Sequence, residues 1–213
     1  MYSKRNYFIV FLYIFGLLFI TTWIWNIMQG ELPLVDQWTR NLVAKVDGTP
    51  IYIFFTWVTK LGSKSFVLPM TIIMAIVLII IYRHIVPGLI FGLGTLASHL
   101  LNHGLKLLVE RERPSISIDL DAVGFSFPSG HAMTSIVCYG LLAYFLAKKC
   151  KNMKVALFVQ IVFAFLVCMV GISRYFINVH YLTDVLTGFM LGYMLLLILI
   201  FLYRFMERLR HPS

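Results

Sequence analysis

The 213-residue chain contains few charged residues, few cysteines and no low-complexity linker. Charged residues make up 13% of it and hydrophobic residues 60%, with a mean hydropathy of +0.87. A soluble domain carries about 25% charged residues, so this composition indicates a membrane protein. Cys138, Cys150 and Cys168 show no regular spacing, which argues against a disulfide framework and a cysteine-based metal site. No internal repeat divides the chain, and we predict a single domain over residues 1–213.

The apolar runs predict an all-α polytopic membrane protein with six transmembrane helices. A hydrocarbon core about 30 Å thick requires about 20 apolar residues per helix. The first run ends in Trp and Met residues rather than in the small residues of a cleavage site, so we expect an uncleaved span there. A shorter run, 51–59, cannot cross alone and is expected to join the second span or lie at the interface. The expected spans are 7–27, 65–82, 85–108, 130–147, 155–173 and 184–203.

The distribution of charge predicts the orientation. With the N-terminus inside, ten of the eighteen Lys and Arg residues face the cytoplasm, including the run KKCKNMK at 148–154. Eight of the nine acidic residues then lie outside, so the whole net charge of +9 falls on the inner side, as the positive-inside rule favours. We therefore predict a cell-membrane protein with both termini cytoplasmic. Membrane topology thus accounts for the excess of Lys and Arg. We expect no nucleic-acid partner, because binding one would require a solvated basic face.

The segment 33–48 has the pattern of a short amphipathic helix. Leu34, Trp38, Leu42 and Val46 recur every four residues between Pro33 and Gly48. We expect this helix to lie flat on the outer surface of the membrane. An ordinary polar connector is the alternative interpretation.

Three polar clusters interrupt the apolar pattern. The first closes the third predicted span, the second opens the fourth, and the third joins the fifth and sixth. Because these loops lie on the same side of any six-span bundle, the clusters can meet at its outer mouth, within a signature region of about 106–184. They are K-x6-RP (Lys106, Arg113, Pro114), PSGH (Pro128, Ser129, Gly130, His131) and SR-x5-H-x3-D (Ser173, Arg174, His180, Asp184).

The residue types in these clusters are suited to a tetrahedral anion. Lys106, Arg113 and Arg174 are cations, and the planar fork of arginine matches phosphate oxygens. At the start of the fourth span, Ser129 and Gly130 offer free backbone N–H groups at the positive end of a helix dipole. Glycine also lets a ligand approach the backbone closely.

Two histidines supply the chemistry for phosphoryl transfer. His180 and Asp184 are four residues apart and share a face if this segment is helical. Asp184 can then accept the imidazole N–H and leave the other nitrogen as a nucleophile. His131 starts a different helix and can protonate the leaving oxygen and later activate water. No carboxylate cluster or Cys/His set indicates a metal, and we expect no cofactor.

Other polar residues receive more ordinary interpretations. His99 and His103 have spacing compatible with a metal, but with Asn102 they are expected to form interhelical hydrogen bonds or support the site. The run Glu110, Arg111 and Glu112 is expected to be solvated or to face lipid headgroups. Asp119 and Asp121 are expected in the loop over the site.

The three motifs resemble, without departure, the signature of the type 2 phosphatidic acid phosphatase superfamily. The six-span plan is similar to that of its bacterial membrane members, and the resemblance covers about residues 51–204. It implies metal-independent phosphate hydrolysis, with His180 as nucleophile, Asp184 as its partner and His131 as acid and base. It implies phosphate binding by Lys106, Arg113, Ser129, Gly130 and Arg174, with Pro114, Pro128 and Ser173 in support. Soluble vanadium haloperoxidases share the signature, but the apolar composition argues against that activity.

The resulting prediction is an integral membrane lipid phosphatase that acts at the outer face through a phosphohistidine, with the bilayer and a lipid phosphate as its partners. Undecaprenyl diphosphate is ranked first as substrate, by analogy. Phosphatidylglycerol phosphate and phosphatidic acid are alternatives. A lipid phosphotransferase on the same site is a second hypothesis. An anion transporter is a remote third, because five of the six midspans contain no charge.

Overall fold

Long helices dominate the computed structural model, which describes residues 4–115, 120 and 122–210, with side chains from Tyr13 onward. Six of them correspond to the six predicted spans, with ends that differ by up to seven residues. They are α1 (Lys4–Met28), α4 (Lys64–Tyr82), α5 (Val86–Val109), α6 (Gly130–Lys149), α7 (Met153–Phe176) and α8 (Leu182–Arg210). The predicted all-α fold is therefore confirmed.

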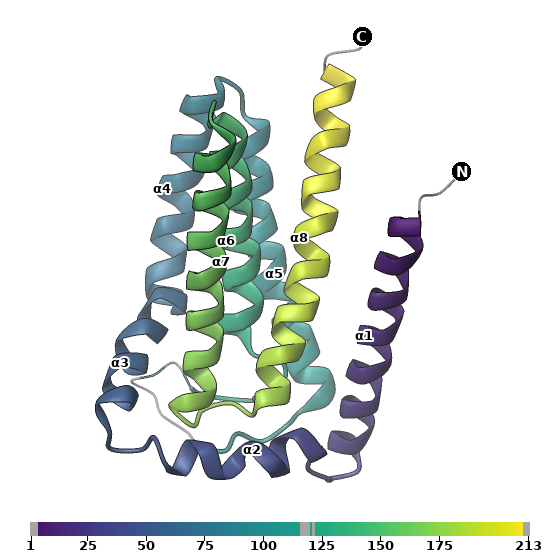
Figure 1. Cartoon of the computed structure of the whole chain (residues 1–213), viewed down its shortest axis with the longest axis vertical. Coiled ribbons are helices and arrows are strands. Elements are labelled where there is room, and N and C mark those ends of the chain that lie inside the picture. Colours follow the sequence, from purple (N-terminus) through teal and green to yellow (C-terminus); the bar gives the residue numbers. More distant parts are fainter. Residues whose placement is uncertain (1–3, 116–119, 121, 211–213) are drawn as a thin grey trace.

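Four of these helices, α4, α6, α7 and α8, are long and apolar enough by themselves to cross a membrane. In α1, the described apolar stretch Tyr13–Met28 is shorter. Although α5 has 24 residues, the polar side chains in its second half, His99, Asn102 and His103 among them, lower its hydropathy. Because α5 runs beside α4 and α6 through the bundle (Figure 1), it occupies the place of a span.

Two short helices and a 3-10 turn lie between the first and second spans: α2 (Leu34–Ala44), α3 (Pro50–Thr59) and η1 (Lys60–Gly62). The short run at 51–59 is therefore a separate helix, whose Phe55 ring stacks on Phe176 of α7 with centroids 4.8 Å apart. In Figure 1, α2 and α3 lie at the end of the bundle opposite both termini.

α6 is the central helix of the bundle and packs against α5, α7 and α8. Apolar tails of lipid offer no hydrophobic drive for helices to associate, so close van der Waals packing through small residues is the main stabilising interaction. Gly188 and Gly192 of α8 provide it here. A Cβ atom at Gly188 would lie 2.6 Å from the Ser129 carbonyl oxygen, and one at Gly192 would lie 2.7 Å from that of Met133. This contact brings the start of α8 against the start of α6.

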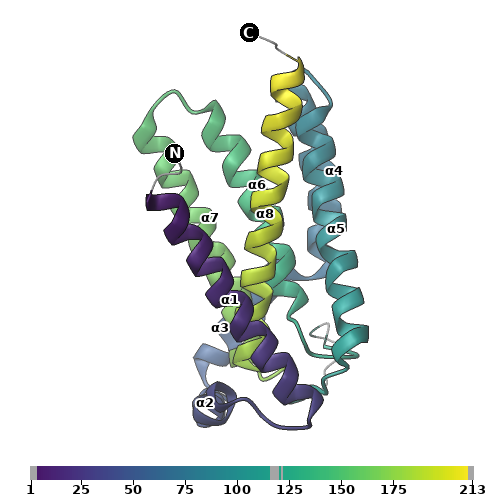
Figure 2. The same ribbon diagram turned by 90° about the vertical axis from the view of Figure 1, so that its right-hand side faces the viewer.

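The chain ends and the polar loops lie at opposite ends of the bundle (Figures 1 and 2). The described parts of the α5–α6 connection contact both the α7–α8 connection and α2, so the two polar loops lie at the same end of the bundle, as the sequence predicts. The helix ends near the termini carry basic side chains: Lys148 and Lys149 end α6, and Arg208 and Arg210 end α8.

Candidate active site

The three sequence motifs converge at the end of the bundle that holds α2. Arg113 and His180 come from the two loops, while Lys106, His131 and Asp184 lie at the ends of α5, α6 and α8. The side chains of Lys106, Arg113, His131 and His180 line one cavity, together with Gly130. Asp184, Ser129 and Arg174 are buried behind this lining. The predicted assembly of residues from distant parts of the sequence is thus present in the structure.

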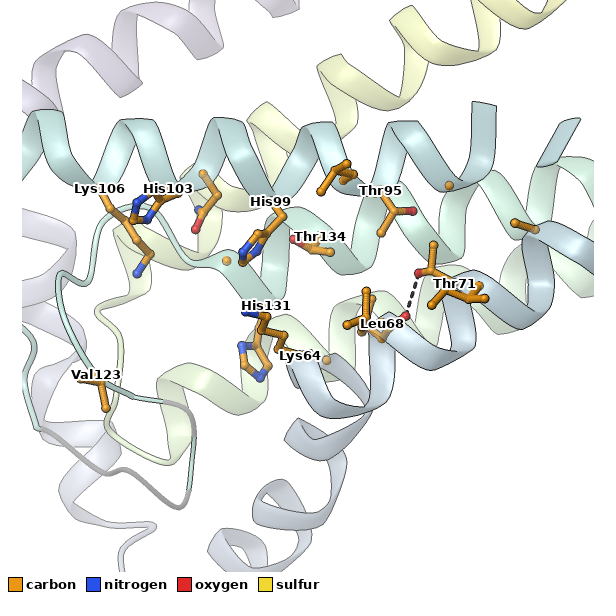
Figure 3. A pocket seen from close by; sticks show the side chains of 18 of the residues that line it. Lys64, Leu68, Thr71, Thr95, His99, His103, Lys106, Val123, His131 and Thr134 are labelled. Carbon is orange, nitrogen blue, oxygen red and sulfur yellow. Dashed lines mark hydrogen bonds between the residues drawn. The ribbon is translucent and has the colours of Figure 1, made fainter. Parts of the chain in front are cut away.

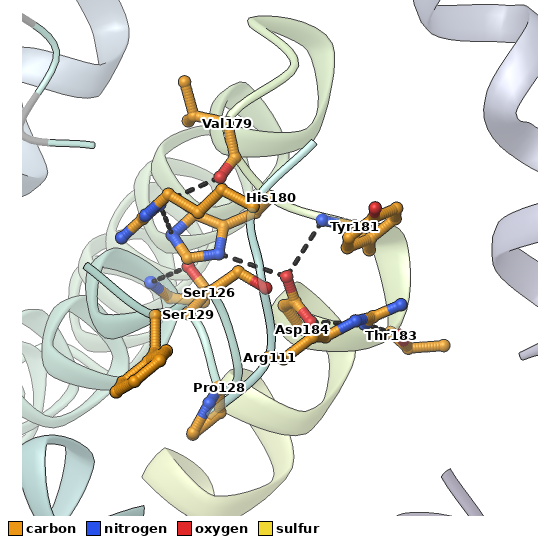
Figure 4. A network of polar contacts seen from close by, with 12 residues as sticks. Arg111, Ser126, Pro128, Ser129, Val179, His180, Tyr181, Thr183 and Asp184 are labelled. Atoms are coloured by element: carbon orange, nitrogen blue, oxygen red, sulfur yellow. Dashed lines mark hydrogen bonds and ion pairs between the residues drawn. The ribbon is translucent and has the colours of Figure 1, made fainter. Parts of the chain in front are cut away.

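His180 is held between a carboxylate and a guanidinium (Figure 4). Its Nδ1 lies 3.3 Å from Asp184 Oδ2, and its Nε2 lies 3.0 Å from Arg113 Nη1. Because Arg113 can only donate, Nε2 must accept, and the ring proton is on Nδ1, where it is donated to Asp184. Nε2 therefore carries the lone pair that a nucleophile uses, and in this structure that lone pair accepts the Arg113 N–H.

The electrostatic surroundings keep His180 neutral. Burial is the largest cause, followed by the positive charges of Arg113, Arg174 and Lys106, and together they lower the pKa of His180 well below its usual value of 6.5. A neutral imidazole is the reactive form.

Arg113 is fixed by backbone carbonyl groups on two loops. Its Nε donates to Gly124 at 2.9 Å and its Nη1 to Val179 at 2.8 Å. Lys106 similarly donates to the Phe125 carbonyl oxygen of the same loop. Both cations are thus placed around the cavity before any anion arrives, so little ordering remains to be done on binding.

Arg174 is completely buried, although its helix end is close to the loops. Its Nη1 donates to Thr59 Oγ1 at 2.9 Å and to the Leu120 carbonyl oxygen at 2.7 Å. Arg174 therefore does not extend to the membrane interface, as a lone arginine near a helix end often does. Its charge reaches the site from behind the cavity lining.

The N-terminus of α6 points into the same site. Ser129 is its N-cap and accepts a long hydrogen bond, 3.5 Å, from the Ala132 N–H. The expectation of a free Ser129 N–H is wrong, because this group donates to the Asp184 carbonyl oxygen at 3.0 Å. Asn102 on α5 donates to the Pro128 carbonyl oxygen at 3.0 Å. This bond joins α5 to the turn before α6 and agrees with the second of the two roles expected for Asn102, support of the site. It also explains why position 130 is glycine, because a Cβ there would lie 2.9 Å from Asn102 Oδ1.

The residues expected to support the site differ in what they contact. Pro128 is buried beside the α6 N-terminus, and Pro114 lines a smaller cavity under α2. Ser173 donates to the Val170 carbonyl oxygen of its own helix at 2.6 Å. Asp119 and Asp121 lie outside the described residues, so their expected place over the site stays a prediction.

The expectation for Arg111 is wrong. It is not solvated but 6% exposed. Its guanidinium binds Asp184 and Thr183 (Figure 4), and it also binds Asp36 of α2. Glu110 and Glu112 are exposed as expected. Beyond the end of α5 both arginines of the E-R-E-R run contact the protein interior, while both glutamates are exposed. This alternation of Glu and Arg is visible in the sequence, but it was not used for the prediction.

The amphipathic helix was predicted correctly, but its contribution to the site was missed. The apolar side chains of Leu34, Trp38 and Leu42 are exposed, whereas Asp36 on the other face is 2% exposed and points into the protein. Contact of the apolar face with a membrane stays a prediction.

The cavity extends well beyond the polar cluster. Its volume is about 1060 Å³, and it runs between α4 and α5 (Figure 3). Lys106 lies at one end, His103 and then His99 follow along α5 with His131 opposite them, and the other end is mostly apolar (Figure 3). The lining there includes Val67, Leu68, Ile72, Ala75, Ile76 and Leu96. Among the described residues, no group of three His, Cys, Asp or Glu side chains is placed to hold a metal.

Known proteins share both the sequence and this architecture. The PAP2 superfamily model matches residues 87–209. Phosphatidylglycerophosphatase B of Bacillus subtilis is 39% identical over 135 residues, which are 63% of this chain and 66% of that protein, just under two thirds of its length. A crystal structure described as the first transmembrane PAP2-type phosphatidylglycerolphosphate phosphatase, also from Bacillus subtilis, has a TM-score of 0.75 and 29% identity, covering 94% of this chain and 98% of that one. The family match includes the three motifs and more than half of the chain, and this protein therefore belongs to the PAP2 superfamily.

Proposed function

We propose that this protein is a membrane phosphatase that hydrolyses a lipid phosphate through a phosphohistidine on His180. The observation that carries the proposal is the placement of His180 Nε2. Asp184 fixes the ring proton on the opposite nitrogen, Nε2 lies 3.0 Å from Arg113 Nη1, and His180 lines one cavity together with Lys106, Arg113 and His131.

The first chemical step is an in-line displacement at phosphorus. The lone pair of His180 Nε2 forms the P–N bond as the bond to the leaving oxygen breaks, and His131 gives that oxygen a proton. In the second step His131 takes a proton from water, the resulting hydroxide attacks phosphorus, and the P–N bond breaks to release inorganic phosphate. Lys106, Arg113 and Arg174 stabilise the negative charge on the phosphoryl oxygens in both steps.

The shape of the cavity supports a lipid substrate. A volume of about 1060 Å³ exceeds what a phosphate group needs, and it matches the upper range of small-molecule sites. The polar end accommodates the phosphate, while the apolar wall between α4 and α5 is suited to acyl chains.

We place the site at the outer face of the membrane. The helix ends near the termini are rich in Lys and Arg, including Lys148, Lys149, Arg208 and Arg210. The positive-inside rule favours a cytoplasmic location for that end, and the site lies at the other.

Phosphatidylglycerol phosphate is the proposed substrate, because the names of both relatives specify it. Undecaprenyl diphosphate, which the sequence analysis ranks first, stays a prediction to be tested beside it. The lipid phosphotransferase hypothesis uses the same phosphohistidine with another acceptor in place of water.

The test is phosphate release by purified protein in detergent with EDTA present. The substrates are phosphatidylglycerol phosphate, undecaprenyl diphosphate, phosphatidic acid and a soluble phosphate ester. His180→Asn removes the nucleophile with little change in size, and His84→Asn, at the far end of the bundle, is the matched control.

We expect lipid phosphate hydrolysis by the wild type and the control, with none by His180→Asn, and the highest kcat/KM for phosphatidylglycerol phosphate. Substantial turnover by folded His180→Asn would refute the phosphohistidine. Transfer of the phosphoryl group to an added alcohol at the expense of hydrolysis would favour the phosphotransferase.

A further inference from the structure

Arg111 joins the carboxylate of Asp184 to the interfacial helix α2. Its Nη1 lies 2.5 Å from Asp184 Oδ1, and its Nη2 lies 2.8 Å from Asp36 Oδ2. The guanidinium also stacks on the Tyr181 ring, 3.8 Å from its centroid. One planar group is thus fixed on both edges and on one face.

Thr183 closes this network. Its backbone N–H donates to Asp36 Oδ1 at 3.0 Å, and its hydroxyl donates to Asp36 Oδ2 at 2.6 Å. Arg111 Nη1 lies 2.9 Å from the same hydroxyl oxygen. Asp36 and Arg111 are 2% and 6% exposed, and Thr183 and Asp184 are fully buried. Removing one member of a buried network leaves the others without compensation, so such contacts determine position strongly.

The network constrains the carboxylate that His180 uses. Asp184 Oδ2 faces the His180 ring and the Tyr181 N–H, while Oδ1 is occupied by Arg111. With one oxygen held, rotation of the carboxylate is restricted and the other oxygen stays aligned with His180 Nδ1. Arg111 does not line the cavity, so a lipid phosphate in the cavity would not contact it directly.

We infer that Arg111 is a positioning residue for phosphoryl transfer, and that Asp36 on α2 is its anchor. The Asp184 carboxylate, which aligns His180, is thereby held in place from α2, a helix outside the three motifs. This inference rests on the proposed function, because it assumes that His180 is the nucleophile and that Asp184 orients it.

Arg111 is the cation shared by two buried carboxylates, and this arrangement predicts how a double substitution should behave. Arg111 separates two buried carboxylates, those of Asp36 and Asp184, and compensates both. Without the guanidinium these two buried anions lose the cation they share. Asp36 then keeps the Thr183 donors, and Asp184 keeps the His180 and Tyr181 donors. Neutralising Asp36 in addition should then relieve part of the defect, whereas two independent defects would multiply.

The experiment compares Arg111→Gln, Asp36→Asn and the double variant, assayed as purified full-length protein. Arg40→Gln and Asp47→Asn are matched controls, because both side chains are exposed on or just after α2. The measurements are kcat and KM for phosphatidylglycerol phosphate, the inhibition constant of inorganic phosphate, and the unfolding temperature.

We expect Arg111→Gln to lower kcat by about 100-fold and Asp36→Asn by about tenfold, with KM and the phosphate inhibition constant changed by less than about threefold. The double variant should be at least as fast as Arg111→Gln alone. A purely structural role would lower the unfolding temperature and leave kcat per folded molecule unchanged, which would overturn the inference.

A double variant slowed by the product of the two single effects would also overturn it. If Arg111→Gln does not fold, Asp36→Asn and Thr183→Val test the same network, because both nearly preserve side-chain volume. The readout is then kcat alone, and wild-type kcat in both variants would overturn the inference. A wild type that releases no phosphate, or a fully active His180→Asn, would instead refute the proposed function itself.

Discussion

Replacing Asp184 with asparagine should abolish most activity, because the amide cannot satisfy the hydrogen bonds that surround this position. Three N–H donors converge on the carboxylate, from His180 at 3.3 Å, the Tyr181 backbone at 2.9 Å and Arg111 at 2.5 Å. An asparagine NH₂ must face at least one of them. If it faces His180, the ring proton moves to Nε2, where it meets the Arg113 donor.

The magnitude follows from the interactions lost. In the transition state the imidazole becomes positively charged, and a hydrogen bond to a charged group contributes about 1.5–3 kcal/mol. A buried donor left without an acceptor costs about 1–3 kcal/mol more. A total of about 2.5–6 kcal/mol corresponds to a fall in kcat of roughly 10²- to 10⁴-fold, since about 1.4 kcal/mol is a factor of ten.

The assay is steady-state phosphate release, with kcat expressed per folded molecule and Asp47→Asn as the control for the same chemical change at an exposed site. KM should change little, because Asp184 does not line the cavity. A fall in kcat of less than about tenfold would refute the argument that Asp184 determines the tautomer of His180.

Three further predictions follow from the site. The pKa of His180 is lowered below 6.5, first by burial and then by the Arg113 charge, so the reactive neutral ring persists as the pH falls below 6.5. The acid limb of the kcat/KM profile should therefore lie well below pH 6.5 once the ionisation of the substrate is divided out. An acid limb at or above pH 6.5 would contradict this. Gly130→Ala should lower kcat/KM about tenfold, because the new Cβ would lie 2.9 Å from Asn102 Oδ1. The control Gly104→Ala should leave activity unchanged, because a Cβ there would meet no atom within 4 Å. Equal activities of the two variants would count against a close contact between position 130 and Asn102. Orthovanadate should inhibit competitively and EDTA should have no effect; activity lost in EDTA and restored by a divalent cation would contradict a metal-free mechanism.

The sequence was sufficient to predict the six long helices and that the three motifs meet at one end of the bundle. Apolar runs of about 20 residues have few structural solutions in a bilayer, and the helix ends agreed to within a few residues at most positions. Sidedness then placed Lys106, Arg113, His131 and His180 at one end of the bundle, because loops that alternate between two faces leave no other arrangement.

What only the tertiary structure decided is which polar residues turn inward and what each one contacts. The sequence alone did not distinguish Arg111 from its exposed glutamate neighbours, nor single out Asp36 within an amphipathic helix, because each acquires its role from partners more than 70 residues away. The hydrophobic period and the composition of a segment predict its secondary structure and burial. A buried ion network depends instead on how α2, the Arg111 segment and α8 are placed relative to one another. That placement is determined by packing, including the contact of Gly188 with the start of α6.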